Sequence, residues 1–132
     1  VENAGPDGLG GWLLTLGRIV LSGMAISAAL AAVSMAASSL TDRRAFAAIG
    51  IVLVLFATPI LAAALVEGAD LSPYWRVIDI STMPFELVFR IFGDPGNYPE
   101  LATWAVLASN VVWTVGGVAI VWGRYSPLVI AR

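Results

Sequence analysis

Three long stretches without charged residues dominate the chain: Ile19–Leu40, Ala45–Val66 and Leu101–Trp122. Each stretch contains 22 residues, so as an α-helix it would extend about 33 Å at about 1.5 Å per residue. This length is sufficient to cross the hydrocarbon core of a bilayer, which is about 30 Å thick. The pattern predicts an all-α integral membrane protein with three transmembrane helices, at about 19–40, 45–66 and 101–122.

The three predicted spans differ in composition. The second is the most apolar, whereas the first is rich in Ala and Ser. The first is also compatible with a start as early as Trp12, which would leave Arg18 near the interface with its aliphatic stem along the helix. The third is framed by Trp104 and Trp122, and such amphipathic rings are enriched at membrane interfaces. All three stretches therefore have compositions that suit membrane spans.

The connection between the second and third spans, residues 67–100, also contains a fairly apolar part at 74–92. Four charged residues lie in that part: Arg76, Asp79, Glu86 and Arg90. At about 2.5–3.5 kcal/mol for each charge near mid-membrane, a fourth span here would cost on the order of 10 kcal/mol. The segment is therefore predicted not to cross the membrane.

The second half of this segment, residues 84–92, has the pattern of a short amphipathic helix. An apolar stripe follows the spacing i, i+3, i+4 and i+7 and consists of Phe85, Val88, Phe89 and Phe92. Glu86 and Arg90 form an i,i+4 ion pair on another face, and Pro84 suits the first helical turn. We expect an interfacial helix that the aromatic stripe packs across the outer ends of the spans. A gate over a transport pathway is the alternative.

The overall composition excludes several classes of protein. Hydrophobic residues make up 59% of the chain and charged residues only 12%, against about 25% charged residues in soluble domains. This balance excludes an ordinary soluble enzyme, a disordered chain and a nucleic-acid-binding protein, which needs a basic surface. The sequence has no Cys and no His, and no carboxylate lies within a predicted span. We expect no catalytic residues, no metal site and no cofactor.

The positions of the arginines indicate how the spans are oriented. The first two spans are joined only by a tight turn that contains Asp42, Arg43 and Arg44. Two further arginines, Arg124 and Arg132, follow the third span, whereas the 67–100 loop has six acidic residues against two arginines. The positive-inside rule therefore predicts a cytoplasmic turn, a cytoplasmic C-terminus and an extracytoplasmic loop, in a multi-pass protein of the plasma membrane.

A face of small residues runs along the first predicted span. Its members are Gly23, Ser27, Ala31, Ser34 and Ser38. Small residues let helix backbones approach closely, and membrane helices associate in this way because lipid provides no hydrophobic driving force between them. We interpret this face as a helix-packing surface, with a polar substrate path as the alternative.

Polar residues in the other two spans are few. Asn110, Thr114 and Gly117 share one face of the third span, with Asn110 near its middle, and Thr58 precedes Pro59 in the second span. A proline there is expected to kink the helix. An amide within the membrane must find a hydrogen-bond partner. We interpret Asn110, Thr114 and Thr58 as interhelical polar residues, and the alternative places them along a translocation pathway.

The order of these features resembles a known family. The features are the turn region Ser38–Phe46, Pro84–Val88 with Arg90 and Gly93, Asn110, Trp113–Thr114, Gly116–Gly117 and Trp122–Tyr125. From about Trp12 to Arg132 the chain resembles the C-terminal half of a permease of the type-2 ATP-binding-cassette (ABC) exporter family.

The resemblance implies a definite architecture. Such permeases have six spans, with both ends in the cytoplasm, and work as dimers with two ATPase domains. The chain would then be a single membrane domain, residues 1–132, that contains the last three of six spans of a longer permease, with residues 1–11 as a flexible lead-in. The partners implied are an ABC ATPase subunit, a second permease copy and membrane lipid, but no nucleic acid. The family's main ATPase coupling helix lies between its second and third spans, a region that these residues do not include. The alternative is a small non-transporting three-span protein, such as an assembly subunit or an anchor.

Overall fold

The computed structural model describes residues 8–130 and consists of helices joined by short connections. In chain order the elements are α1 (Gly8–Ser39), α2 (Arg44–Ala63), the π-helical turn η1 (Ala64–Gly68), the 3-10 helix η2 (Pro73–Ile78), α3 (Met83–Ile91) and α4 (Thr103–Ile130). No strand occurs within residues 8–130. Three helices are long and apolar enough to cross a membrane: Gly8–Ser39, Arg44–Gly68 and Thr103–Pro127. The predicted all-α fold with three such helices is confirmed.

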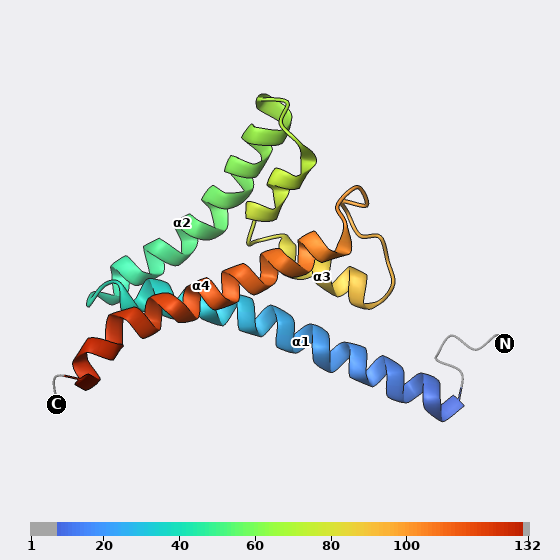
Figure 1. The fold of residues 1–132 in the computed structure, drawn as a ribbon, viewed down its shortest axis with the longest axis horizontal. Helices are drawn as coiled ribbons and strands as arrows, with labels where there is room; N and C mark the ends of the chain where they lie inside the picture. The colour runs from blue at the N-terminus through green and yellow to red at the C-terminus, as the bar shows by residue number, and fades with distance from the viewer. Residues whose placement is uncertain (1–7, 131–132) are drawn as a thin grey trace.

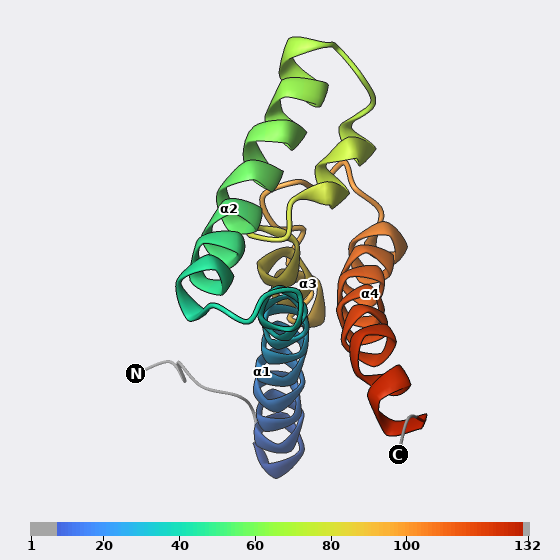
Figure 2. The same cartoon turned by 90° about the vertical axis from the view of Figure 1, so that its left-hand side faces the viewer.

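The three long helices form a splayed frame. In Figure 1, α1 and α4 run in the same general direction and cross, whereas α2 rises away from the C-terminal end of α1. Viewed from the end in Figure 2, α2 and α4 stand on opposite sides of α1, with α3 between them. The helix α3 packs against both α1 and α4. The segment between the second and third long helices therefore inserts into the frame.

Both α1 and α4 are longer than the predicted spans. Because α1 begins at Gly8, residues 8–11 of the predicted flexible lead-in are helical, while residues 1–7 of that lead-in lie outside the described residues. With 32 residues, α1 extends about 48 Å, against about 30 Å for a hydrocarbon core. A helix of this length must tilt in a bilayer or extend beyond its surface.

The packing of α1 on α4 depends on small residues, but on a different face from the predicted one. The buried residues of α1 are Ser22, Ala29, Ala32, Val33, Ala36 and Ser39. The two helices approach closely at Gly117 of α4, where an added Cβ would lie 2.6 Å from the backbone oxygen of Ala32. The predicted packing face is not the one that packs on α4: Gly23, Ser27, Ala31 and Ser38 are exposed, and Ser34 is half-buried. The size of the side chains does not distinguish the two faces of α1, because alanine is as small as serine. The face that packs is the one that lies against Gly117 of α4.

The helix α2 makes few contacts along its length, and Ala62 is its only buried residue. The α-helix continues through Pro59, and the departure from α-helical hydrogen bonding follows at η1. The Thr58 hydroxyl donates to the carbonyl of Val54 at 2.9 Å, so it is satisfied within its own helix. The side chains of α2 are therefore largely free to face lipid.

The segment between α2 and α4 forms a re-entrant hairpin, with η2 as one limb and α3 as the other. At its tip, Ile80 is fully buried in a hydrophobic cluster with Ala29 and Val33 of α1, and residues of the other two long helices pack against this cluster: Val54, Leu55 and Trp113. Trp113 lies ten residues after the start of α4, which is about 15 Å along the helix axis. The tip therefore reaches between the long helices, whereas the prediction placed only the 84–92 helix across the outer ends of the spans.

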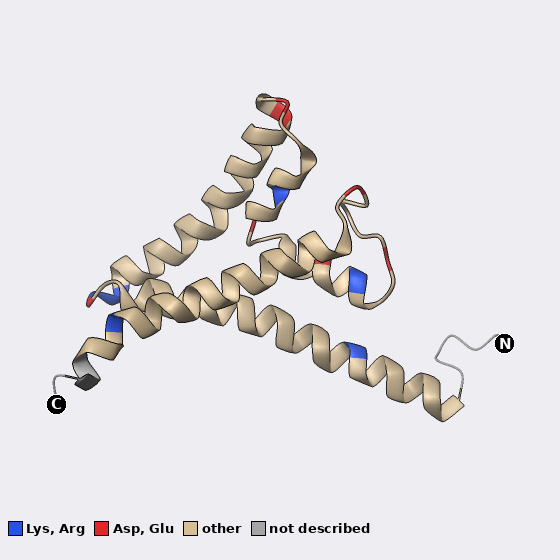
Figure 3. Cartoon of the chain, viewed as in Figure 1, with Lys and Arg blue, Asp and Glu red and all other residues tan. Residues whose placement is uncertain are grey.

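Charged side chains gather at the two ends of the frame. Figure 3 shows arginines of the α1–α2 turn and of α4 together at one end, while acidic residues lie in the turn after α2 and in the loop before α4. Arg18, by contrast, lies within α1.

Candidate functional site

The tip of the hairpin contains a carboxylate whose hydrogen bonds are supplied locally. Asp79 is buried, and its Oδ1 accepts hydrogen bonds from the backbone N–H of Ser81 at 2.9 Å and from the Ser81 hydroxyl at 2.5 Å. Its Oδ2 accepts from the Thr82 hydroxyl at 2.6 Å. These three donors replace the water molecules that a carboxylate loses when it is buried. A charged, non-helical tip can therefore lie between the spans.

Glu86 on α3 has no exposed surface and holds the loop that follows the helix. Its Oε1 accepts from the backbone N–H of Asn97 at 2.8 Å, and its Oε2 lies 3.9 Å from the guanidinium of Arg90. Gly96 has a φ of +73°, and a Cβ at this position would overlap the Glu86 carboxylate. Glycine is therefore required here both by the backbone conformation and by the space the carboxylate occupies.

Arg90 joins α3, the loop and the start of α4. Its guanidinium donates to the carbonyl of Tyr98 at 2.8 Å, to the carbonyl of Leu101 at 2.9 Å and to the Thr103 hydroxyl at 3.2 Å. The Arg90 side chain is only 9% exposed. Glu86 and Arg90 thus form a buried charged cluster that fixes the loop from residue 94 to residue 102 against α3.

This orientation of α3 reverses the predicted one. The aromatic residues of the predicted stripe point outward: Phe85, Phe89 and Phe92 are 51%, 37% and 40% exposed, and Val88 is half-buried. The buried face instead contains Met83, Glu86 and Leu87. The helix itself lies within one residue of the predicted 84–92. In a membrane an aromatic stripe can face lipid, while a charged pair needs protein partners. The sequence prediction instead packed the aromatic stripe against the ends of the spans.

Two neighbouring polar residues of α4 hold the two limbs of the hairpin. The Ser109 hydroxyl donates to the carbonyl of Val77 in η2 at 2.5 Å. The Asn110 side-chain amide donates to the carbonyls of Met83 in α3 at 3.1 Å and of Val106 at 2.9 Å. The buried Asn110 therefore makes a hydrogen bond between helices. The role of Ser109 was missed, although its position beside Asn110 in an apolar stretch was the available signal.

The candidate polar residues of the spans do not converge on one path. Asn110 faces the hairpin, Thr58 bonds within α2, and Thr114 is half-buried on α4. Gly117, on the same face of α4 as Asn110, packs against α1. Within residues 8–130, no group of three Asp and Glu side chains is arranged to hold a metal ion.

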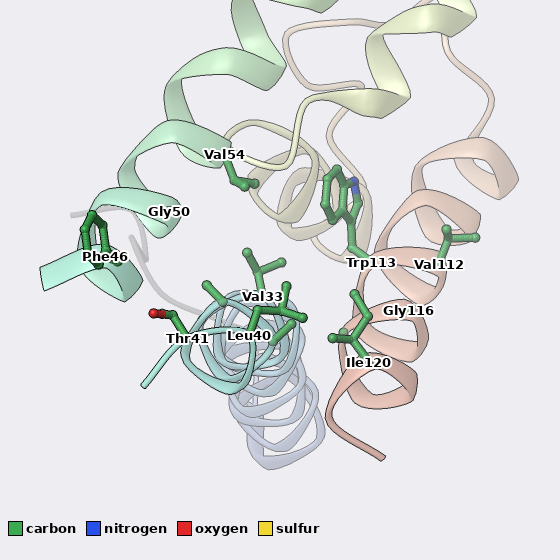
Figure 4. Close-up of a pocket in the computed structure, with 13 residues that line it drawn as sticks. Val33, Leu40, Thr41, Phe46, Gly50, Val54, Val112, Trp113, Gly116 and Ile120 are labelled. Carbon is green, nitrogen blue, oxygen red and sulfur yellow. The ribbon is translucent and has the colours of Figure 1, made fainter. Parts of the chain in front are cut away.

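An apolar groove opens between α2 and α4, with α1 as its floor. Its volume is about 590 Å³. Figure 4 shows Trp113 of α4 and Val54 of α2 at one end of the groove and Phe46, Thr41 and Ile120 nearer the other. The remaining lining residues are Val33, Ala36, Ala37, Leu40, Gly50, Val112, Gly116 and Gly117. The lining of the groove is thus almost entirely apolar.

The turn between α1 and α2 is linked to the C-terminal part of α4. The guanidinium of Arg124 donates to the carbonyl of Ser39, in the last turn of α1, at 3.1 Å. The guanidinium of Arg43 lies 5.6 Å from the centre of the Phe46 ring. Asp42, Arg43 and Arg44 are exposed. The turn arginines and Arg124 therefore lie at the same end of the frame.

The opposite end is held by Arg76 of η2. Its guanidinium donates to Glu67 at 2.8 Å and stacks over the Tyr98 ring at 4.6 Å. The hydrogen bond to Glu67 raises the pKa of Arg76. The nearby rings of Tyr74 and Trp104 are stacked, with centroids 6.2 Å apart. These contacts attach η2 to η1, to the loop and to the start of α4.

The chain matches no protein-family model, and no curated protein or solved structure shows significant similarity to it.

Proposed function

We propose that the chain is a membrane-spanning permease subunit of a type-2 ABC exporter, in which it forms part of a translocation pathway driven by a separate ATPase subunit. The observation that carries the proposal is the re-entrant hairpin, whose charged tip lies between the spans. Non-helical backbone at membrane depth is tolerated where protein covers it or where it borders a water-filled cavity. Ionisable residues at such depth mark substrate or ion pathways in membrane proteins.

The order of elements adds support. A span, a tight basic turn, an apolar span, a helical extracytoplasmic segment and a last span follow one another as in the second half of such a permease. In this proposal α1, α2 and α4 are the fourth, fifth and sixth spans. The ends with Arg43, Arg44 and Arg124 face the cytoplasm of the cell, and the plasma membrane is the site of action.

A second permease copy would complete the assembly. The α1 residues Gly23, Ser27, Ala31 and Ser38 remain exposed in the single chain. A face of small residues on a membrane helix allows another helix to approach closely. In the proposed dimer this face receives a helix of the second copy or of the preceding spans.

The orientation is tested with single cysteines, because the native sequence has none. Asn97→Cys and Asp70→Cys should react with a membrane-impermeant maleimide in intact cells, and Asp42→Cys should react only after the membrane is opened. All three positions are exposed, so accessibility in opened membranes serves as the matched control. Labelling of positions 42 and 97 from the same side would contradict the proposed topology.

The transport role is tested by purification of the chain from its native membranes in a mild detergent. An ABC ATPase should copurify, and its vanadate-sensitive ATP hydrolysis should depend on the presence of the chain. Recovery of the chain with no nucleotide-hydrolysing partner would contradict the proposal and favour the small non-transporting subunit.

A further inference from the structure

The apolar groove between α2 and α4 has the size and lining of a binding site. Its volume of about 590 Å³ falls within the range of about 300–1,000 Å³ that is usual for small-molecule sites. Apart from Thr41, the residues that line it are glycines or have aliphatic or aromatic side chains. The Trp113 ring is the largest of these side chains. Trp113 and Val54 form one end of the groove, and both also pack against the hydrophobic cluster that contains Ile80 at the hairpin tip. The groove therefore suits a hydrocarbon chain.

Three arginines lie near the other end of the groove, although none is among its lining residues. Phe46 lines the groove and lies under the Arg43 guanidinium, while Ile120 lines it one helical turn before Arg124. Arg44 borders a neighbouring hollow that shares Thr41 with the groove. Among residues 8–130, the ion pairs present are Arg76–Glu67 and Arg90–Glu86, so these three arginines have no carboxylate partner there. With the carboxylate of Asp42 in the same turn, three arginines against one acidic residue leave a net positive charge near this end of the apolar groove.

We propose that the groove binds one anionic phospholipid, with an acyl chain along the groove and the phosphate among Arg43, Arg44 and Arg124. Basic clusters next to spans attract anionic lipid headgroups, and basic pockets between membrane helices bind them. The charge argues against a second copy as the occupant: copies inserted in the same orientation would bring the same three arginines to the same leaflet. This inference concerns lipid binding and does not depend on the proposed transport function.

The binding is tested in nanodiscs with a phosphatidylglycerol that has a photoactivatable diazirine in its acyl chain. The same acyl chain on phosphatidylcholine, whose headgroup has no net charge, is the matched probe. The proposal expects cross-links in residues 33–54 and 112–120, several-fold stronger for phosphatidylglycerol. Equal cross-linking of the two lipids at these residues would overturn the headgroup assignment, and absence of cross-links there would overturn the site.

Two sets of variants separate the acyl-chain site from the headgroup site. A Cβ at Gly116 meets no other atom within 4 Å, so Gly116→Leu fills the groove without displacing a helix. Gly50→Leu is a second filling variant, because a Cβ there makes only an ordinary contact of 3.9 Å with Ala37. Both should reduce cross-linking of both lipids, while Val118→Leu, outside the groove, should not. Unchanged cross-linking in two folded filling variants would contradict the groove as the site.

Arg43→Gln and Arg44→Gln should each weaken capture of phosphatidylglycerol about fivefold, which corresponds to about 1 kcal/mol per basic residue near an anionic surface. Capture of phosphatidylcholine should not change. Arg18→Gln is the control because Arg18 lies in α1, outside the groove lining. An equal effect of Arg18→Gln would contradict a headgroup site at the turn.

A disulfide between two copies with Val112→Cys would show a second copy in the groove and would also overturn the proposal.

Discussion

The helices α2 and α3 lie in the same molecule but invert the usual relation between apolarity and burial. The most apolar of the long helices, α2, buries only Ala62. The short helix α3 has a charged pair, and its Glu86 is fully buried. Between membrane helices there is no hydrophobic driving force, because lipid tails are as apolar as leucine. In this frame the most apolar long helix is therefore the least buried, whereas the charged pair of α3 lies inside the protein contacts.

The largest effect should come from the buried charge on α3. Glu86→Leu leaves Arg90 without its carboxylate and frees the backbone N–H of Asn97, so we expect the free energy of unfolding to fall by about 3–5 kcal/mol. Denaturation in detergent, followed by tryptophan fluorescence, measures this loss. In the double variant Glu86→Leu, Arg90→Leu no unpaired charge remains, but the hydrogen bonds of Arg90 to Tyr98, Leu101 and Thr103 are also lost, so stability should not return in full. The exposed carboxylate of Glu67 serves as the matched control, and Glu67→Gln should cost about 0–1 kcal/mol. An equal loss for Glu67→Gln would remove the distinction between the two regions.

The next largest effect should come from the contact between α1 and α4. Gly117→Ala places a Cβ 2.6 Å from the Ala32 carbonyl oxygen, and this overpacking should lower the free energy of unfolding by about 1–3 kcal/mol. Gly116→Ala is the neighbouring control, since its Cβ meets open space, and it should have no destabilising effect. The same denaturation assay compares the two. Because alanine favours a helix more than glycine does, a similar loss in both variants would show that the loss does not come from the contact with Ala32.

A smaller effect is expected at Asn110. Asn110→Leu removes the hydrogen bond to the Met83 carbonyl and should cost about 0.6–2 kcal/mol, the range for interhelical hydrogen bonds in membranes. Hydrogen exchange of residues 83–91 should increase while exchange in α1 remains unchanged. If transport is established and falls at constant stability in this variant, Asn110 borders the pathway and its packing role is secondary.

The smallest effects are expected at aromatic residues that face outward. Phe56 of α2 and Phe85 of α3 are 66% and 51% exposed. Phe56→Ala and Phe85→Ala should each change the free energy of unfolding in detergent by less than about 0.5 kcal/mol, as for surface positions. A loss of about 3–5 kcal/mol for Phe85→Ala, typical of a buried aromatic, would restore the orientation predicted from the sequence and contradict the inverted one.

The sequence was sufficient for the features that depend on length and composition. Uncharged stretches of 22 residues indicated the three long helices, and the boundaries of α3 were predicted to within one residue because Pro84 and Gly93 limit it. The charge density indicated which ends lie together, and Arg124 does lie beside the α1–α2 turn. Each of these features follows from local information.

The features that depend on partners could not be predicted in the same way. Which face of α1 packs is decided by Gly117, which lies 85 residues after Ala32 in the sequence. The position of the hairpin between the long helices depends on the hydrogen bonds that Asp79 accepts from its own turn. It also depends on the hydrogen bond from Ser109 of α4 to the Val77 carbonyl. Periodicity alone shows that α3 has two faces and leaves open whether lipid or protein covers the aromatic one.

The hydrogen bonds from α4 to the hairpin have a consequence for the biogenesis of the chain. Val77 and Met83 receive their partners from Ser109 and Asn110, which are synthesised 32 and 27 residues later. At about 5–20 residues per second, the hairpin waits on the order of 1–5 s for them during translation. During that interval the insertion machinery must keep the polar groups of the hairpin away from lipid. A premature stop between α3 and α4 therefore leaves an incompletely bonded hairpin, a product suited to proteolytic removal by membrane quality control.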